Sequence, residues 1–311
     1  MEARIEGPRW ELRRGSAAYP GALERASKPP GILYVVGDPD ALQEGLAIVG
    51  ARKATPYGLG CARRFSRLAA QEGVCVISGG ARGCDAAAHE GALAAGGRTV
   101  AFLGGGCDRI YPAEHAGLFQ RIVDGGGALA SEHGWGVEPR PWMFRARNRL
   151  IASLAAATLI VEAGLPSGTF STADEALAAS REVLVVPGAI TAATSRGANR
   201  LLFQGATPIV DDESFGDVLL SLFGRLKRQD AAAEGSTGPI PRGGQGAPMG
   251  GTDSFARALA AEPIDMEGLL SLARERCGDA DPRSWLAARL AEAEASGLAA
   301  RYPDGRWGPV V

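Results

Sequence analysis

The sequence predicts an α/β protein with a doubly wound sheet, followed by a small C-terminal winged-helix domain. Between about residues 31 and 210, short apolar runs alternate with longer alanine-rich segments, a pattern typical of parallel strands with helices on both faces. Nearly every run ends in glycine or serine, at the carboxyl edge where such sheets bind ligands. After a stretch rich in glycine and proline, helix-like segments and a short strand pair complete the chain.

The apolar runs predict the strands of the sheet in order, with a helix or loop between each pair. Residues 1–30 precede the first run and are too few for a domain, so we expect a short N-terminal segment followed by a sheet domain over 31–223. The predicted strands cover residues 32–37, 46–50, 74–80, 99–106, 128–134, 158–164, 182–188 and 207–210.

The apolar pattern stops after Phe223. Residues 224–252 are rich in glycine, proline and small polar residues, which predicts a flexible linker. Over 253–311 the segments SFARALAAEP, DMEGLLSLAR and DPRSWLAARLAEAEASG are helix-like, and a PDG turn at 303–305 then joins two short strands. Three helices followed by a hairpin are the order of a winged helix.

The third of these helices has clear sequence signals. We expect Asp281 to cap its N-terminus, with Pro282 in the first turn, and a buried stripe of Leu286, Leu290 and Ala293. Residues 253–311 hold 7 Arg and 10 Asp or Glu, a net charge of 7 − 10 = −3. A helix that enters the major groove should be basic. We therefore interpret this domain as a protein-contact or regulatory element.

Composition limits the class of protein. The chain has 311 residues, 46% of them hydrophobic, and a formal net charge of −2, so a nucleic-acid surface has to be a local patch. The five cysteines have no CxxC pair and are typical of a reduced, cytoplasmic protein. No apolar run approaches the roughly 20 residues of a membrane span, and the N-terminus lacks a signal sequence. We expect a cytoplasmic protein without a membrane partner.

The loop after the predicted strand 74–80 is a candidate phosphate site. Glycines and an arginine lie between a strand and a helix, so that backbone N–H groups and a helix N-terminus both face an anion. A mononucleotide, a dinucleotide and a nucleic-acid backbone could all use such a loop. Its candidate binding residues are Ser78, Gly79, Gly80, Arg82 and Gly83.

Two further segments carry positive charge. Arg52 and Lys53 follow the predicted strand 46–50 and precede a helix that opens at Pro56, whose N-terminus adds partial positive charge. The segment 140–150, RPWMFRARNRL, has no acidic residue and mixes arginines with aromatic rings, as single-stranded nucleic acid requires for phosphate neutralisation and base stacking. Its candidate residues are Phe144, Arg145, Arg147, Asn148 and Arg149.

The last candidates follow the predicted strands 158–164 and 182–188. The SGT tripeptide presents backbone amides ahead of a helix, which makes Ser167, Gly168 and Thr169 candidates for phosphate binding. The segment 187–202 is predicted to be a loop, and it contributes Gly197 and Asn199.

Several ligand classes are excluded. The GGG at 104–106 is not a GxGxxG motif, and no acidic residue about 20 positions later follows a strand as a ribose ligand, which argues against NAD. The chain has no GxxxxGK[ST] motif, which excludes a P-loop nucleotidase. The histidines and cysteines lack metal-ligand spacing. We expect no metal and no cofactor.

Several segments together resemble the DNA processing protein A family (DprA or Smf), from about residue 19 to residue 223. They are SGGARGCDAAAHEGAL, TVAFLGGGCDRIYP, FRARNRLIASLAAATLIVEAGLPSGTFSTADEAL and GANRLLFQGA. The combination of SGGARGxD, RNRxIA and SGTxxTADEA in this order is highly specific. Many members carry a helical domain ahead of the sheet, where this chain has about 30 residues.

The resemblance implies an extended Rossmann-like fold and a protein that is not an enzyme. It implies a homodimer that binds single-stranded DNA, protects incoming DNA and helps to load the RecA recombinase in natural transformation. It also implies that Arg52, the SGGARG loop and the segment from Arg145 to Arg149 line a DNA-phosphate pocket.

An enzyme is the alternative interpretation. The segment LPSGTFSTADE and the arginines before it are also similar to the motifs of nucleotide phosphoribohydrolases of the LOG type. In that interpretation Glu175 would stabilise a ribosyl cation and Arg147 would bind the phosphate. The winged-helix segment and the RNRxIA form favour DNA binding.

Overall fold

The structure of the chain is a computed structural model. It describes residues 4–165, 167–224, 255, 266–276, 281–295, 299–301 and 307–309. The chain divides into two compact units, Met1–Gly235 and Ser236–Val311. None of the helices in the described residues is long and apolar enough to span a bilayer.

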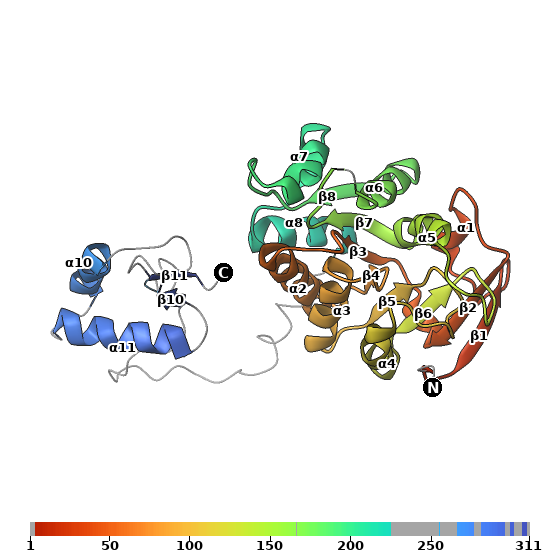
Figure 1. The fold of residues 1–311 in the computed structure, drawn as a ribbon, viewed down its shortest axis with the longest axis horizontal. Coiled ribbons are helices and arrows are strands. Elements are labelled where there is room, and N and C mark those ends of the chain that lie inside the picture. Colours follow the sequence, from red (N-terminus) through yellow and green to blue (C-terminus); the bar gives the residue numbers. More distant parts are fainter. Residues whose placement is uncertain are drawn as a thin grey trace, which may run out of the picture. The chain divides into compact units, whose positions relative to one another are not determined.

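The first unit contains a nine-stranded sheet with the order β1-β2-β6-β5-β4-β3-β7-β8-β9, which can be followed in Figure 1. Every one of the strands predicted from the apolar runs is present. The strands are β1 (Arg9–Arg13), β2 (Ile32–Gly37), β3 (Gly45–Val49), β4 (Val76–Ser78), β5 (Thr99–Phe102), β6 (Ala128–Ser131), β7 (Ala155–Ile160), β8 (Glu182–Val185) and β9 (Thr207–Pro208).

From β6 across to β9 neighbouring strands are parallel, but β2 runs in the opposite direction to all of them. Strand β2 pairs antiparallel with β6, and β1 pairs antiparallel with β2. Only residues 38–44 separate β2 from β3, and a parallel crossover needs a dozen or more residues. The chain therefore turns directly from the end of β2 into β3. The apolar runs alone predicted the strand β2 but not its direction.

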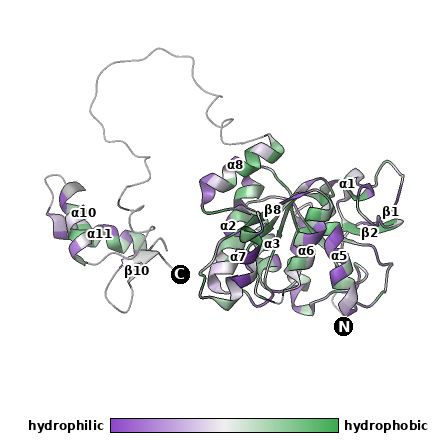
Figure 2. Ribbon diagram, turned by 90° about the horizontal axis from the view of Figure 1, so that it is seen from above, coloured by the Kyte–Doolittle hydropathy of each residue, from purple (hydrophilic) through white to green (hydrophobic). Residues whose placement is uncertain are grey.

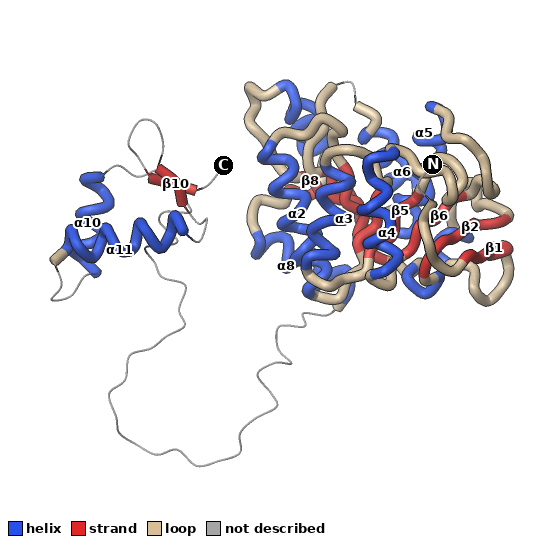
Figure 3. The backbone as a smooth tube through the Cα atoms, turned by 60° about the horizontal axis from the view of Figure 1, so that its bottom comes forward, coloured by secondary structure: helices blue, strands red, loops and turns tan. Residues whose placement is uncertain are grey.

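Helices cover both faces of the sheet, as a doubly wound fold requires. In Figure 3 helices α2, α3 and α4 lie in front of the strands, and α8 packs against α2 on the same face. This layer consists of α2 (Pro56–Gln71), α3 (Cys84–Ala94), α4 (Ala116–Asp124) and α8 (Asp212–Phe223). The opposite layer consists of α1 (Gly21–Glu24), α5 (Pro141–Leu154), α6 (Thr169–Ala178) and α7 (Arg196–Phe203).

The core lies between the sheet and each helix layer. Along β3, Ile48 packs with the α2 layer while Ala47 and Val49 pack with the α5 layer, as the alternation of side chains along a strand dictates. Each large aliphatic side chain that is fully buried in this way contributes about 1.5–3 kcal/mol to folding. Figure 2 shows hydrophobic residues around the central strands and hydrophilic residues on α5.

The N-terminal segment is part of the sheet unit, which sequence analysis did not predict. Strand β1 extends the sheet beyond β2, and Leu12, Tyr19 and Leu23 are buried in the core cluster beneath α5. The Tyr19 hydroxyl donates a hydrogen bond of 2.8 Å to the carbonyl oxygen of Pro30. These contacts attach residues 9–30 to the α5 side of the sheet.

The predicted loop over 187–202 is wrong in its second half. Helix α7 starts at Arg196 and contains both Gly197 and Asn199. A Cβ on Gly197 would lie 2.5 Å from the carbonyl oxygen of Gly164, so the glycine allows the helix to approach the segment after β7. Burial of Ala198 and Leu201 outweighs the low helix propensity of glycine.

The described residues of the second unit form α10 (Met266–Arg276), α11 (Pro282–Ala295) and an antiparallel pair of β10 (Ala299–Arg301) and β11 (Trp307–Pro309). The Ser284 backbone N–H donates a hydrogen bond of 2.9 Å to Asp281 Oδ2, so the predicted N-cap is confirmed. The predicted stripe is confirmed as well, because Leu286, Leu290 and Ala293 are all buried. Apart from Gly224, the predicted linker over 224–252 lies outside the described residues, as do most of the first predicted helix and the turn at 303–305.

Candidate functional site

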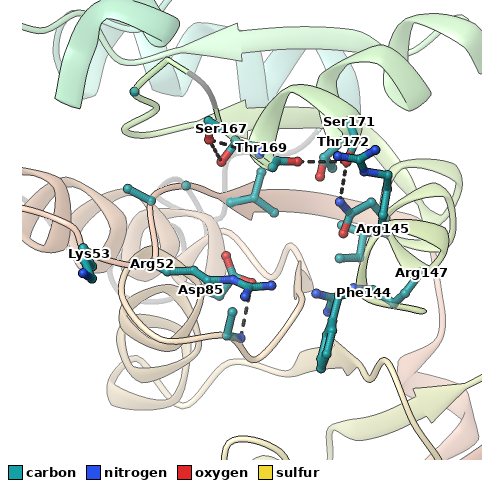
Figure 4. Close-up of a pocket in the computed structure, with 18 of the residues that line it drawn as sticks. Arg52, Lys53, Asp85, Phe144, Arg145, Arg147, Ser167, Thr169, Ser171 and Thr172 are labelled. Carbon is teal, nitrogen blue, oxygen red and sulfur yellow. Dashed lines mark hydrogen bonds between the residues drawn. The ribbon is translucent and has the colours of Figure 1, made fainter. Parts of the chain in front are cut away.

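A cleft of ≈ 610 Å³ lies at the carboxyl ends of the parallel strands. Strands β3 and β7 are neighbours in the sheet, yet the chain continues from them toward opposite edges, and such a switch point is where doubly wound sheets bind ligands. Figure 4 shows the lining side chains. The cleft is lined by the loop after β3, the start of α5, the loop before α6 and residues ahead of α7.

Two glycines bring the loops after β3 and β4 into contact. Gly83 has a φ of 78°, and a Cβ there would lie 2.2 Å from the carbonyl oxygen of Ala51. The next residue, Cys84, donates its backbone N–H to the same oxygen at 3.2 Å. A Cβ on Gly50 would lie 2.6 Å from the sulfur of Cys84. Larger residues at either glycine would separate the loops that form one wall of the cleft.

A buried carboxylate anchors the other end of the loop after β3. Glu162, which is 2% exposed, accepts hydrogen bonds from the backbone N–H and the hydroxyl of Thr55 at 2.9 and 3.0 Å. Thr55 in turn caps α2 by accepting from the Gly58 backbone N–H at 3.2 Å. Arg52 and Lys53 therefore lie in a short loop that is fixed at both ends. Glu162 was not among the predicted site residues, and its only signal in the sequence is that it is the one charged residue in the apolar run 158–164.

Exposed cations and an aromatic ring lie together in the cleft. The guanidinium carbon of Arg52 lies 5.5 Å from the ring centroid of Phe144, within the range of a cation–π contact. Arg52, Lys53 and Arg145 are all exposed to solvent and line the cleft. Their charges are therefore available to an anion.

Arg147 lies at the floor of the cleft, and it is only 4% exposed. Its Nη1 donates hydrogen bonds to the carbonyl oxygens of Gly79 and Phe102, at 2.6 and 2.5 Å, and its Nε is buried without a hydrogen-bond partner. Burial lowers the pKa of Arg147 to about 10, so the group stays charged at neutral pH. This charge contributes to the field of the cleft, and the side chain joins α5 to the β4 and β5 ends.

Asp85 is the acidic side chain among the described residues that line the cleft. Burial raises its pKa, while Arg147, the Ala81 backbone N–H and Arg52 act in the opposite direction. The Ala81 N–H donates to Asp85 Oδ2 at 3.4 Å. With Arg52, Lys53, Arg145 and Arg147 on the same surface, the cleft has a net positive charge.

The turn before α6 adds polar groups. The Ser167 hydroxyl accepts a hydrogen bond from the Thr169 backbone N–H at 3.2 Å and donates to its hydroxyl at 3.0 Å. Asn148 on α5 donates to the Ser171 hydroxyl at 2.7 Å. This contact holds the start of α6 against α5, so that the helix N-terminus, with its partial positive charge, faces the cleft.

The structure divides the residues predicted from sequence into two groups. One group lines the cleft: Arg52, Lys53, Phe144, Arg145, Arg147, Asn148, Ser167, Gly168 and Thr169. The other group lies behind or beside it: Ser78, Gly79, Gly80, Arg82, Gly83, Arg149, Gly197 and Asn199.

Most members of the second group have structural contacts. The Ser78 hydroxyl donates to the Ile48 carbonyl oxygen at 2.6 Å, and Asn199 forms a pair of hydrogen bonds with the backbone of Gly188. Arg149 forms a two-pronged ion pair with Glu132, with both N···O distances at 2.6 Å. The sequence predicted these residues to bind DNA, and the structure places them behind or beside the cleft instead of in its lining.

The chemistry of the cleft fits a polyanion better than a reaction. Glu175, the carboxylate that the enzyme interpretation requires, does not line the cleft. Its charge acts on Arg149, which lies beside the cleft. Within the described part of the chain, no three His, Cys, Asp or Glu side chains are grouped to hold a metal ion. Exposed cations, an aromatic ring and a helix N-terminus suit phosphates and bases.

Comparison with known proteins agrees with this geometry. Residues 11–219 match the DNA recombination-mediator protein A family. The chain belongs to this family. The predicted resemblance is thereby confirmed, and family membership places the chain with DNA-processing proteins rather than with nucleotide phosphoribohydrolases.

Individual relatives match more than half of this chain. Protein Smf of Escherichia coli is 41% identical over 199 residues, which are 64% of this chain and 53% of the relative. DNA processing protein DprA of Mycobacterium tuberculosis is 44% identical over 197 residues, 61% of this chain and 50% of the relative. The chain thus spans about half the length of these two relatives.

Two solved structures have the same fold. DNA processing protein A from Streptococcus pneumoniae has a TM-score of 0.62 at 30% identity, covering 70% of this chain and 75% of that one. The Helicobacter pylori protein, whose structure describes a single-stranded DNA binding mode, has a TM-score of 0.63 at 31% identity and covers 70% of this chain and 98% of that one.

Proposed function

We propose that the cleft binds single-stranded DNA with little sequence preference. The observation that carries the proposal is the contact between Arg52 and Phe144, 5.5 Å apart, in a positively charged cleft. A single strand presents phosphates and unpaired bases side by side, so a cation next to a ring face matches both. The single-stranded DNA binding mode of the Helicobacter pylori relative supports the same conclusion.

Each lining residue has a role in this proposal. Arg52, Lys53 and Arg145 neutralise phosphates, and the amides at the start of α6 bind a phosphate oxygen. Phe144 stacks with a base. Arg147 maintains positive charge at the floor, while Gly79 and Gly83 keep the loops close enough to form the wall.

The cellular role proposed here follows from the family. The chain binds incoming single-stranded DNA in the cytoplasm, protects it and helps to load the RecA recombinase in natural transformation or recombination. It acts as a homodimer. Exposed apolar side chains on and near α6 and α7 support an interface there, since Leu177, Ile190 and Phe203 are 61, 88 and 84% exposed, and such surfaces mark association sites.

The second unit is proposed to be a winged helix that contacts protein rather than DNA. Two helices and an antiparallel strand pair support this fold. On α11, Arg289 forms an ion pair with Glu292 at 2.9 Å, which leaves no surplus of positive charge on that face. Arg283 and Arg289 of α11 are balanced by Glu292 and Glu294, and a helix without surplus positive charge is a poor match for the major groove.

A binding titration tests the function. Fluorescence anisotropy with labelled oligothymidylate, repeated with duplex DNA and over a series of salt concentrations, should give tighter binding to the single strand. The slope of log K against log[salt] should be about −0.7 for each phosphate neutralised. Affinity that does not change with salt would contradict the cleft as a phosphate site. Release of free base from nucleoside monophosphates would favour the phosphoribohydrolase instead.

A further inference from the structure

The rim of the cleft beside Phe144 carries a second aromatic ring. Tyr111 lies in the loop between β5 and α4, and its ring centroid is 5.2 Å from that of Phe144 with an interplanar angle of 45°. The side chain is 48% exposed. Because Phe144 contacts Arg52 within the cleft, Tyr111 continues the aromatic surface outward from the site.

An exposed ion pair lies next to this ring. The Arg82 guanidinium pairs with the Glu114 carboxylate, and the side chains are 60 and 52% exposed. Tyr111 lies three residues before Glu114 in the same loop, so one short segment carries both the ring and the acidic partner of Arg82. His115 Nδ1 lies 3.0 Å from the carbonyl oxygen of Gly80, which fixes the segment that carries Glu114 against the loop that carries Arg82.

The pair is a weak source of stability, because exposed ion pairs lose most of their attraction to water and to side-chain entropy. The Glu114 carboxylate nevertheless occupies the Arg82 guanidinium, which is then not free to bind a phosphate. Arg52 contacts Phe144, Phe144 contacts Tyr111, and Tyr111 lies three residues before Glu114, the partner of Arg82. The order along this surface is therefore cation, ring, ring and cation. Such a row matches a strand whose bases stack while its phosphates are neutralised on either side, except that Glu114 blocks the last cation.

We propose that bound single-stranded DNA leaves the cleft over Phe144 and Tyr111, and that a phosphate of the strand displaces Glu114 from Arg82. This inference rests on the proposed function and extends it to a defined path. Glu114 acts as an intramolecular competitor, so that Arg82 contributes only to strands that extend beyond the cleft. The carboxylate lowers affinity, and its removal should raise it.

The main test is the gain of affinity in Glu114→Gln. Oligothymidylate of about 16 nucleotides, the upper end of the site sizes of single-strand-binding folds, should bind more tightly to the variant. The salt slope should stay close to that of the unmodified protein, because Arg82 contacts the phosphate in both complexes and only the competing carboxylate is removed. A damaged fold cannot produce such a gain. The matched control is Glu90→Gln, which removes an equal charge from the exposed Arg63–Glu90 pair and should bind like the unmodified protein.

Two further variants separate a direct contact from a general charge effect. The gain should vanish in the Arg82→Ala/Glu114→Gln double variant, since the phosphate would have no guanidinium to bind. If the gain persists there, or if Glu90→Gln shows the same gain, the displacement is wrong. Tyr111→Ala should weaken binding about fivefold or more, and Tyr111→Phe should restore it. Equal affinity for Tyr111→Ala and the unmodified protein would overturn the path.

Other results would contradict the proposed function itself, and they can be told apart from a failure of the path over Tyr111. If the unmodified protein does not bind the oligonucleotide, or if Arg52→Ala binds as well as the unmodified protein, the cleft is not the DNA site. If Arg52→Ala weakens binding while Glu114→Gln has no effect, the cleft stands and only the path over Tyr111 is lost.

Discussion

The guanidinium of Arg147 occupies the space that a side chain at residue 79 would take. Its Nη1 lies 2.6 Å from the Gly79 carbonyl oxygen, and a Cβ built on Gly79 would lie 2.1 Å from the same nitrogen. Because Gly79 in the SGGARG loop has no side chain, a buried arginine from α5 can bind the ends of β4 and β5. The loop and the arginine segment, far apart in sequence, form one structural unit.

Arg147→Ala should therefore destabilise the fold. The Gly79 and Phe102 carbonyl oxygens would each lose a donor in the interior, and the free energy of unfolding should fall by about 2 kcal/mol or more. Urea denaturation measures the loss. Arg147→Lys, which keeps a charge but not the planar fork, should recover only part of it. Unchanged stability in Arg147→Ala would show that water satisfies these carbonyls.

Arg145 and Arg149 should behave in opposite ways although they lie four residues apart. Arg149→Ala leaves the Glu132 carboxylate, only 18% exposed, without its guanidinium, so we expect a loss of about 1–3 kcal/mol in stability. Arg145 is exposed and lines the cleft. Arg145→Ala should change stability by less than about 0.5 kcal/mol but reduce the salt slope of DNA binding by about 0.7. Anisotropy titration and urea denaturation of both variants check this contrast.

Much of the fold could be predicted from the sequence. The apolar runs predicted every strand from β2 to β9 because a strand covered on both faces has to be continuously apolar. The glycines at strand ends predicted the edge where the cleft lies. The strand β1, RWELR, is exposed at most positions, so it has no apolar run to detect.

The role of each arginine could not be read from its spacing. Arg145, Arg147 and Arg149 alternate in one segment, yet they respectively face solvent, the interior and a carboxylate. Their directions depend on helix geometry and on the position of Glu132 in a separate loop. Glu162 was missed for the same reason, because its partner Thr55 is distant in sequence.

Arg52 offers a matched comparison with an arginine of the second unit. The guanidinium carbon of Arg52 lies 5.5 Å from the Phe144 ring, and that of Arg289 lies 5.5 Å from the Trp285 ring. Arg52→Glu reverses the charge beside the cleft, whereas Arg289→Glu reverses a charge on a helix that already has Glu292 and Glu294. Anisotropy titration should show a much larger loss of single-stranded DNA affinity for Arg52→Glu. Equal losses would indicate that the second unit also binds DNA.

The buried His89 should make the fold sensitive to mild acid. Thr99 Oγ1 donates its proton to the Val76 carbonyl oxygen at 2.7 Å, so His89 Nδ1, which is 2.7 Å from that hydroxyl, has to donate to it. The ring nitrogen Nε2 is then the unprotonated one, and it is buried without a hydrogen-bond partner. A proton on Nε2 would place a charge in the core with no acceptor.

Burial accordingly lowers the pKa of His89 from 6.5 to about 3. Between these values the unfolded chain binds a proton that the folded protein does not, so stability is present above pH 6.5 and is lost as the pH falls toward 3. The loss should be about 1 kcal/mol per pH unit. Urea denaturation between pH 7 and pH 5 measures it, and His89→Asn, which keeps a donor for Thr99 but cannot titrate, should show a flatter dependence. If both proteins lose stability at the same rate, other groups cause the acid sensitivity.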